Sequence, residues 1–312
     1  MRKNQINNRH RIWPGTTRGD RVFLTFVYAV ILLVVLMCAY PLYLTIIASV
    51  SDPYDVYSGK VNLLPSNFTL ESYQLVFSNK QIWQGYANSI LYTVAGTCFN
   101  LFLTIPSAYA LSKKRMYGRN FLTTVFLITM YFGGGMIPTY LLYKNLDLIN
   151  TRWILIIGGG ISVYNVIVTR TYFQNNIPET LFEAARIDGA NEFLTFFKLV
   201  LPLSAPIIAV ITLYYAVGHW GSYFSAMIYT YDQALQPLQL VLRNILILNE
   251  TAYTDALASG DASLIADASR QAYLALTMKY SLVFIASAPM LIAYPFVQKH
   301  FVKGIMVGSL KG

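Results

Sequence analysis

The chain is divided into long apolar stretches without charge and shorter segments that contain all of its charged residues. Six stretches lack any Lys, Arg, Asp or Glu, and together they hold 155 of the 312 residues. A helix that crosses a bilayer needs about 20 apolar residues, with a range of about 17–25. The pattern therefore predicts an all-α, polytopic membrane protein with six transmembrane helices, over residues 22–51, 81–112, 120–143, 153–169, 199–231 and 280–298.

Composition supports this fold class. Hydrophobic residues make up 55% of the chain, charged residues only 12%, and the mean hydropathy is +0.47. An average soluble domain carries about 25% charged residues, and disordered chains need low hydrophobicity and high charge. A β-barrel is disfavoured because the residues from Phe23 to Val50 show no alternation of apolar and polar positions, as barrel strands of about 10 residues would require.

The distribution of Lys and Arg predicts the orientation. With both termini cytoplasmic, the segments 1–21, 113–119, 170–198 and 299–312 hold 16 Lys and Arg residues, against 7 on the other side. Such an excess marks the cytoplasmic face. The chain is then divided into a cytoplasmic segment, 1–21, and a transmembrane domain, 22–312. The basic residues of 1–21 precede a membrane span, so we expect them to contact anionic lipid and not nucleic acid.

Two outer segments have the features of ordered loops. Residues 52–80 contain Pro53, Gly59 and Pro65 and resemble a cap. The longer loop, 232–279, shows helical apolar spacing over Leu238–Leu248, and a second, exposed helix is predicted over Ala256–Arg270. A loop of this length is either functional or disordered. Its helical pattern leaves two interpretations open, a docking surface for a soluble partner or a cap over the bundle.

The cytoplasmic loop contains a predicted pair of short helices at 178–199. Pro178 suits a first helical turn, with Asn176 or Ile177 as the cap, and Gly189 occupies the position where a left-handed residue ends a helix. Asn191 is then the cap of a second helix, Glu192 to Leu199. A sharp turn at the membrane surface is expected between the two.

The first of these helices has the composition of an interface. Ala184 and Ala185 give it a small face, which Glu183, Arg186 and Asp188 surround with charge. A small centre with a polar rim allows another protein to approach closely. The alternative is an amphipathic segment that lies among lipid headgroups.

The full spacing resembles a known motif. Glu183-Ala184-Ala185, Gly189, Leu199 and Leu201-Pro202 are similar to the EAA motif of binding-protein-dependent ABC importer permeases, with Leu199 where that family often has Ile. The resemblance implies the type I ABC importer fold. It also implies that Glu183 to Gly189 forms a coupling helix that docks in a cleft of an ATP-binding subunit.

Other segments are similar to the carbohydrate branch of that family, the branch of the maltose permease G protein. These segments are Tyr131 to Tyr140, Gly218 to Phe224, and the tail from Phe301 to Gly304 and at Lys311-Gly312. Within the branch, the chain resembles permeases for complex oligosaccharides, including pectin- or alginate-derived uronides. Gly221 departs from the pattern, which has Asn after the Trp.

The resemblance also implies partners and a location. A second homologous permease, two ATP-binding subunits and an extracytoplasmic solute-binding protein would act with this chain on an oligosaccharide. ATP and Mg²⁺ would bind to the ATPase subunits, with no cofactor in this chain. The location implied is the prokaryotic cytoplasmic membrane.

A sugar path requires aromatic and hydrogen-bonding side chains, because sugars present both apolar C–H faces and hydroxyls. The alternative role for such aromatic residues is an interfacial belt. The glycine runs 133–135 and 158–160 permit either close helix packing or an unwound segment beside a cavity. The candidate path residues are Asn88, Tyr92, Tyr131, Tyr215, His219, Trp220 and Tyr223.

Three other classes of function were considered. An ion-coupled secondary transporter would keep ionisable groups within its spans, which here lack charge. A non-conducting scaffold subunit would show no dependence on substrate when the span 199–231 is mutated. An enzyme is disfavoured because the sequence contains no phosphate-binding G-x-x-x-x-G-K-[ST] motif, no H-E-x-x-H motif and no Cys/His cluster.

Overall fold

The computed structural model describes residues 17–259 and 262–309, and the regular structure of these residues is entirely helical. The sequence predictions for 1–16 and for the last three residues lie outside this part. The first half contains α1 (Arg18–Ser49), α2 (Pro53–Tyr57), α3 (Glu71–Ser78), α4 (Lys80–Ser112), α5 (Arg119–Tyr131), α6 (Met136–Asn145), α7 (Arg152–Ile157) and α8 (Val163–Asn176). The second half contains α9 (Glu179–Ile187), α10 (Glu192–Thr195), the π-helix η1 (Phe196–Val200), α11 (Leu201–Leu203), α12 (Ala205–Trp220), α13 (Tyr223–Tyr229), the 3-10 helix η2 (Gln233–Leu235), α14 (Leu238–Ser259) and α15 (Ala262–Ser309).

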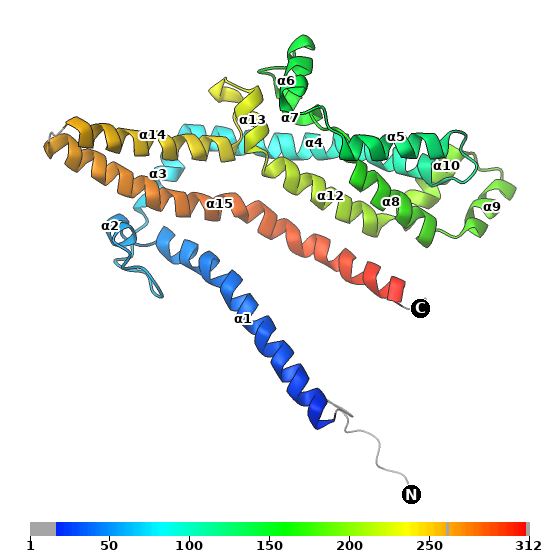
Figure 1. Ribbon diagram of the computed structural model, residues 1–312, viewed down its shortest axis with the longest axis horizontal. Coiled ribbons are helices and arrows are strands. Elements are labelled where there is room, and N and C mark those ends of the chain that lie inside the picture. The colour runs from blue at the N-terminus through cyan, green and yellow to red at the C-terminus, as the bar shows by residue number, and fades with distance from the viewer. Residues whose placement is uncertain (1–16, 260–261, 310–312) are drawn as a thin grey trace, which may run out of the picture.

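Helix α4 lies at the centre of an elongated bundle (Figure 1). It packs against α7, α8, α12 and α14, and α15 packs in turn against α1, α12 and α14. Apolar side chains of α4, α8 and α12 form the largest buried cluster, which includes Val166, Phe173 and Ile211. The bundle therefore has its own core despite its apolar exterior.

Three helices in the described residues are long and apolar enough to cross a membrane, Gly19–Ser49, Lys80–Ser112 and Ser269–Ile292. Two bent helix pairs raise the number to five if each pair forms one span. One is α5 with α6, bent by 112°, and the other is Glu192–Leu203 with Ala205–Trp220, bent by 81°. The fold is thus that of a polytopic, all-α membrane protein, as predicted.

The segment 153–169 is not the single continuous helix that the sequence pattern predicted. The chain leaves the helical conformation at Gly158–Gly160, so α7 and α8 are separate short helices. Residues 132–135 likewise separate α5 from α6. The sequence left two roles open for the glycine runs, and both runs, 133–135 and 158–160, form unwound segments. Hydropathy does not reveal such breaks, because glycine is compatible with an apolar stretch as well as with a break.

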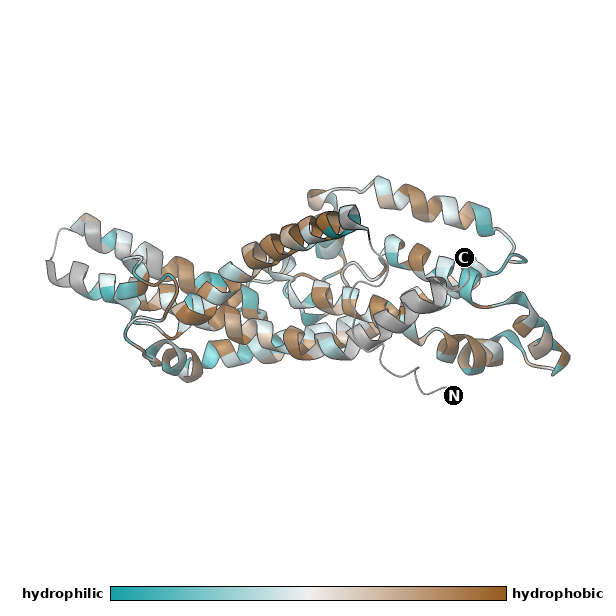
Figure 2. Cartoon of the chain, turned by 90° about the horizontal axis from the view of Figure 1, so that it is seen from below, coloured by the Kyte–Doolittle hydropathy of each residue, from teal (hydrophilic) through white to brown (hydrophobic). Residues whose placement is uncertain are grey.

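Helix α1 projects from the rest of the molecule (Figure 1). None of its most apolar 18-residue window is buried, and Figure 2 shows it as an almost uniformly apolar helix. Its C-terminal end meets α15, where the Ser281 hydroxyl donates to the Ser49 carbonyl at 3.3 Å. Lipid or a second protein must cover the remainder, because an apolar surface of this size is unstable in water.

The structure describes the whole of loop 52–80 and residues 232–259 and 262–279 of the longer loop, which differs from the prediction. A helix begins at Leu238, as expected, and α14 then continues to Ser259. The region Ala256–Arg270 is not a separate helix, because it contains the end of α14 and the start of α15. Helix α15 has 48 residues, so the predicted sixth span, 280–298, is the middle of a much longer helix. Figure 1 shows α14 and α15 side by side as a hairpin.

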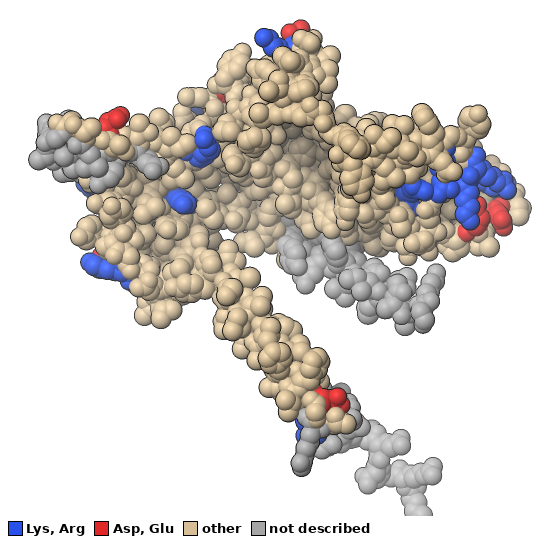
Figure 3. Space-filling model, viewed as in Figure 1, with Lys and Arg blue, Asp and Glu red and all other residues tan. Residues whose placement is uncertain are grey.

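On the visible face, charged side chains form groups at the two ends of the bundle, at the tip of α6, which projects from the middle of the bundle, and at the far end of α1, and the bundle surface between these groups is largely uncharged (Figure 3). At one end they lie around α9 and α10, and at the other they lie around the outer loops. This arrangement agrees with a bundle whose middle lies in the hydrocarbon layer, where charge is costly.

The loop 52–80 is held together by one carboxylate. Asp55, 5% exposed, accepts hydrogen bonds from Ser66 Oγ at 2.6 Å, Asn67 Nδ2 at 2.8 Å and Lys60 Nζ at 3.0 Å. The bonds from Ser66 and Lys60 lower the pKa of Asp55 below its ordinary value of 3.8. The ionised carboxylate thus joins α2 to the chain before α3.

We expect Asp55→Asn to lower the melting temperature of the purified transporter at neutral pH, because an amide cannot accept all three bonds. A lowered carboxyl pKa stabilises the fold above the ordinary value, and this stabilisation is lost as the pH falls through the folded-state pKa. The wild type should therefore lose stability in acid more steeply than Asp55→Asn. The matched control is Asp147→Asn, on another outer segment. Equal pH profiles for Asp55→Asn and the wild type would contradict this role.

Candidate functional site: the coupling helices and a polar cavity

The turn between the predicted coupling helices has the predicted geometry. Helix α9 ends at Ile187, and Gly189 has φ = +75°, in the left-handed region. Asn191 caps α10, accepting the Leu194 N–H at 2.8 Å through its side chain. The first cap is shifted, because Pro178 itself is the N-cap of α9 and not a residue of its first turn.

The second predicted helix is less regular than expected and longer. The chain is helical throughout Glu192–Leu199, but α10 passes at Phe196 into the π-helix η1 and then into the short helix α11, which ends at Leu203. Pro202 has no N–H with which to continue the α-helical pattern. A bend of 81° then separates this segment from α12.

The surface of α9 is largely exposed. Glu183, Ala184, Arg186 and Asp188 are exposed and Ala185 is half-buried, so the small face with its charged rim is accessible. Sequence analysis missed two large apolar side chains nearby. Ile187 is 87% exposed and Phe193 is 71% exposed. The sequence did offer a signal for these two residues, because large apolar side chains within a polar loop often mark a contact surface.

A charged cluster ties the coupling helices to α4. Glu192 accepts a hydrogen bond of 2.7 Å from the Tyr109 hydroxyl and forms ion pairs with Lys113 at 3.5 Å and Arg186 at 3.6 Å. The Lys113 ammonium also lies 3.4 Å from the centroid of the Phe182 ring, a cation–π contact, and burial lowers its pKa. Because Tyr109 belongs to α4, this cluster connects α9 and α10 directly to the central helix.

A cavity of about 320 Å³ lies beside α12, between it and the segments around α7. Its lining is aromatic, hydroxylic and amide-bearing, and no Lys, Arg, Asp or Glu lines it. Two of the predicted path residues, Tyr215 and His219, belong to this lining. Polar residues outside the seven candidates named above also line it: Asn100, Tyr143, Tyr214, Ser222, Ser225 and Tyr229.

Hydrogen bonds fix the two predicted residues. His219 Nε2 lies 2.6 Å from the Asn100 Oδ1, and Asn100 Nδ2 donates to the Gly160 carbonyl at 2.8 Å. The Tyr215 hydroxyl shares a bond of 2.7 Å with Thr104 and accepts the Ser162 N–H at 3.1 Å. Both side chains therefore connect α12 to α4 and to the unwound segment between α7 and α8.

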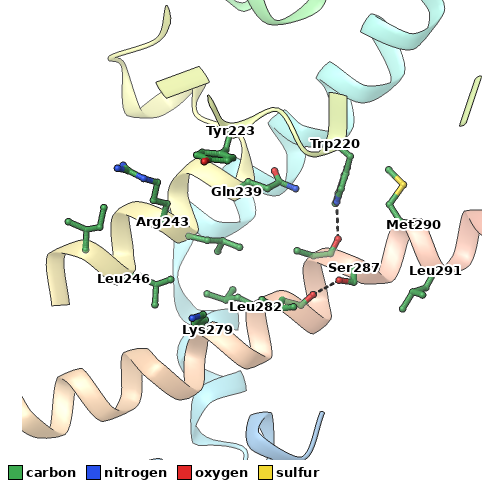
Figure 4. Close-up of a pocket in the computed structure, with 14 residues that line it drawn as sticks. Trp220, Tyr223, Gln239, Arg243, Leu246, Lys279, Leu282, Ser287, Met290 and Leu291 are labelled. Carbon is green, nitrogen blue, oxygen red and sulfur yellow. Dashed lines mark hydrogen bonds between the residues drawn. The ribbon is translucent and has the colours of Figure 1, made fainter. Parts of the chain in front are cut away.

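The structure separates the remaining path candidates. Trp220 and Tyr223 line a second, mostly aliphatic cavity of about 880 Å³ between α14 and α15 (Figure 4). Tyr131 is 76% exposed at the end of α5. Asn88 and Tyr92 are buried, at 4% and 1% exposure.

Asn88 and Tyr92 bond to the non-helical backbone before α14. Asn88 Nδ2 donates to the carbonyls of Ala234 at 2.8 Å and Gln236 at 3.1 Å, and the Tyr92 hydroxyl donates to the Leu235 carbonyl at 2.8 Å. A structural function thus occupies their polar atoms. Contact with a substrate stays a prediction for all seven candidates.

Comparison with known proteins identifies the family. A family model described as "Binding-protein-dependent transport system inner membrane component" matches residues 82–307, well over half of the chain. The chain belongs to this family. It is therefore a membrane-embedded transport component, and the segment from Glu183 to Gly189 lies within the matched region.

Individual relatives of this permease extend over nearly its whole length. It is 39% identical over 293 residues to the polygalacturonan/rhamnogalacturonan transport system permease protein YtcP of Bacillus subtilis, covering 94% of this chain and 99% of the relative. It is 42% identical to Protein LplC of the same organism, over 80% of this chain and 81% of the relative. A chain in the crystal structure of a bacterial ABC transporter that imports the acidic polysaccharide alginate matches with a TM-score of 0.81 and 32% identity, covering 93% of this permease and 100% of that chain.

The position of His219 depends on a glycine in α4. A Cβ added at Gly96 would overlap the His219 imidazole. We expect Gly96→Ala to displace the ring and break its bond to Asn100. The buried amide oxygen of Asn100 then loses its partner, at a cost of about 1–3 kcal/mol. The melting temperature of the purified transporter should fall. The control is Gly133→Ala, where an added methyl meets nothing within 4 Å, and equal melting temperatures for the two variants would contradict the packing role.

Proposed function

We propose that this permease forms half of the translocation path for an oligosaccharide in an ATP-driven ABC importer. The observation that carries the proposal is the cavity beside α12, which combines tyrosine rings, hydroxyls, amides and an imidazole without any charge. Stacking rings and neutral hydrogen-bonding groups suit the C–H faces and hydroxyls of sugars. Within this proposal, Tyr215 and His219 contact the sugar, and Asn88 and Tyr92 hold the surrounding backbone.

The names of the relatives support a complex, acidic substrate. One relative is a permease for polygalacturonan and rhamnogalacturonan, and the related structure belongs to an alginate importer. We propose an oligosaccharide that contains uronic acids. The uncharged lining of the cavity suits a path through which a charged sugar must also leave, because a buried counter-ion would bind it too tightly.

ATP hydrolysis is proposed to occur on two separate ATP-binding subunits, which also bind the Mg²⁺. Helix α9 would dock on one of them through Ala184, Ala185 and the charged rim. ATP favours one conformation of the complex only if its binding differs between the two states. The Glu192 cluster and the bend before α12 would carry that difference to the cavity.

The other partners follow from exposed surfaces and from charge. A second permease subunit would cover part of α1, whose apolar window is entirely unburied. A solute-binding protein would dock on the outer loops and deliver the sugar. Both termini would be cytoplasmic, on the side that carries the Lys and Arg excess.

The function is tested with the complete transporter in proteoliposomes, with its solute-binding protein and a panel of neutral and acidic oligosaccharides. We expect the ATPase rate to rise only with the binding protein and a uronide-containing oligosaccharide together. Purification through this chain should recover a second permease and an ATPase. Transport by the chain alone, or stimulation by an ion gradient without ATP, would contradict the proposal.

Gly189→Val tests the coupling turn. Valine in the left-handed region costs about 1–2 kcal/mol, so α9 should tilt away from its docking position. We expect ATP hydrolysis to continue while sugar uptake falls about tenfold. Gly189→Asn is the matched control, because Asn tolerates φ > 0 and should retain uptake. Full uptake by Gly189→Val at normal membrane abundance would exclude the coupling role.

Gly218→Leu tests the cavity. Gly218 lines it, and a Cβ added there meets nothing within 4 Å, so the new side chain starts in open space beside the cavity. We expect sugar uptake to fall about tenfold or more, with normal assembly. Val217→Leu, at a neighbouring position that is 51% exposed, should leave uptake unchanged. Unchanged uptake in both variants would place the path elsewhere.

A further inference from the structure

The chain between α2 and α3 folds back beside the C-terminal end of α1 (Figure 1). The Tyr43 hydroxyl, six residues before the last residue of α1, donates a hydrogen bond to the Leu63 carbonyl. The Thr69 N–H donates to the Val50 carbonyl at 3.0 Å. Leu63 therefore lies level with a residue inside the membrane-crossing helix Gly19–Ser49, and not beyond the end of that helix.

A second contact places α2 beside a membrane-crossing part of α15. The ring centroids of Tyr57 and Tyr273 lie 4.3 Å apart, and Tyr54 meets Tyr273 edge-on at 6.1 Å. Tyr273 belongs to the membrane-crossing helix Ser269–Ile292. The loop 52–80 is thus attached to two of the helices that cross the membrane, within the ranges that cross it.

The length of α1 indicates where the membrane surface lies. From Arg21 to Tyr43 the helix rises about 33 Å, at 1.5 Å per residue, which is close to the hydrocarbon thickness of about 30 Å. The stretch between these two residues contains no charged side chain. Tyrosine is enriched at the interface between membrane and water, and arginine extends its charge to that interface. Tyr43, and with it Leu63, therefore lies at the interface opposite Arg21.

The loop turns polar groups inward and apolar side chains outward. The Ser66 hydroxyl donates to the buried carboxylate of Asp55 at 2.6 Å, whereas Leu63 and Leu64 are 70% and 74% exposed. No charged residue occurs between positions 61 and 70. Two adjacent leucines at this height are unfavourable in water, and hydrocarbon lies next to them.

We propose that this loop is a membrane anchor, in which Leu63 and Leu64 insert into the acyl chains of the adjacent leaflet. The backbone stays among the headgroups, because residues 60–70 are not helical and their peptide groups need polar partners. Lipid is the occupant because the neighbouring surface of α1 is also apolar and unburied. A soluble protein approaches from the water, beyond the end of α1. The anchor fixes α2, and through it α15, relative to the membrane surface.

The depth of the loop is measured with nitroxide labels on the complete transporter in proteoliposomes. The cysteines of this chain are removed as Cys38→Ala and Cys98→Ala, and those of the partner subunits likewise. Leu63→Cys or Leu64→Cys then carries the label, and its collision rates with oxygen and with a water-soluble nickel chelate are compared. Oxygen enters hydrocarbon and the chelate does not, so we expect an oxygen-to-nickel ratio about tenfold higher than at Lys80→Cys. Lys80, exposed at the start of α4, is the matched control.

Leu63→Ser combined with Leu64→Ser tests the anchor itself. Neither leucine is buried in the protein, so the loop should fold but leave the leaflet. We expect hydrogen exchange of amides 61–68 in proteoliposomes, measured by mass spectrometry, to become about tenfold faster, because the bilayer no longer shields them. Leu63→Phe combined with Leu64→Phe is the matched control. Phenylalanine also enters hydrocarbon, so this variant should exchange as the wild type does.

Three results would overturn the proposal. An oxygen-to-nickel ratio equal to that at Lys80→Cys would place the loop in water. Low collision rates with both reagents at Leu63→Cys and Leu64→Cys would place the leucines against another protein, such as a second permease subunit. Equal exchange rates in the serine variant and the wild type would show that the leaflet does not hold the loop. None of these measurements requires a sugar, so the anchor and the proposed sugar path can fail independently.

Discussion

The fold depends on uncharged polar side chains of α4 that satisfy non-helical backbone within an apolar bundle. A lipid environment supplies no water to unpaired peptide groups, so each must find a partner inside the protein. Toward the N-terminal end of α4, Asn88 and Tyr92 bond to carbonyls of residues 234–236, and the Ser89 hydroxyl accepts the Leu238 N–H at 2.9 Å. Farther along, Asn100 bonds to the Gly160 carbonyl. Without these side chains, neither break in the helices would be stable at that depth.

The same bonds explain why the cavity lies beside the broken segments. A continuous helix presents only side chains to its neighbours, whereas the unwound backbone after α7 frees space and peptide groups next to α12. Tyr215 shows both roles, because its hydroxyl pairs with Thr104 and also accepts the Ser162 N–H. The break between α7 and α8 requires neutral hydrogen bonds to satisfy its peptide groups, so the cavity beside it is polar but uncharged.

Local patterns predicted the features that depend on a few neighbouring residues. Uncharged stretches located α1 and α4, and the turn at Gly189 with its cap at Asn191 followed from backbone preferences alone. The breaks were not predictable in this way, because a partner such as Asn100 lies 60 residues from Gly160. The division of the path candidates between two cavities also depends on partners that are distant in the sequence. Trp220 and His219 are adjacent in sequence, yet one turns toward α15 and the other toward α4.

The chemistry of the contacts between α4 and α12 also suits a moving part. A neutral hydrogen bond contributes only about 0.5–1.5 kcal/mol net, so the pairs Thr104–Tyr215 and Asn100–His219 can exchange partners at modest cost. Buried ion pairs at the same places would resist separation, because breaking one leaves an uncompensated charge. The charges lie instead at the C-terminal end of α4, where Glu192, Lys113 and Arg186 join α9 and α10 to α4 at the surface. Under the proposed function, the ion pairs at the surface would keep α9 and α10 attached to α4, and the neutral bonds at the cavity would let its lining rearrange between two states of the path.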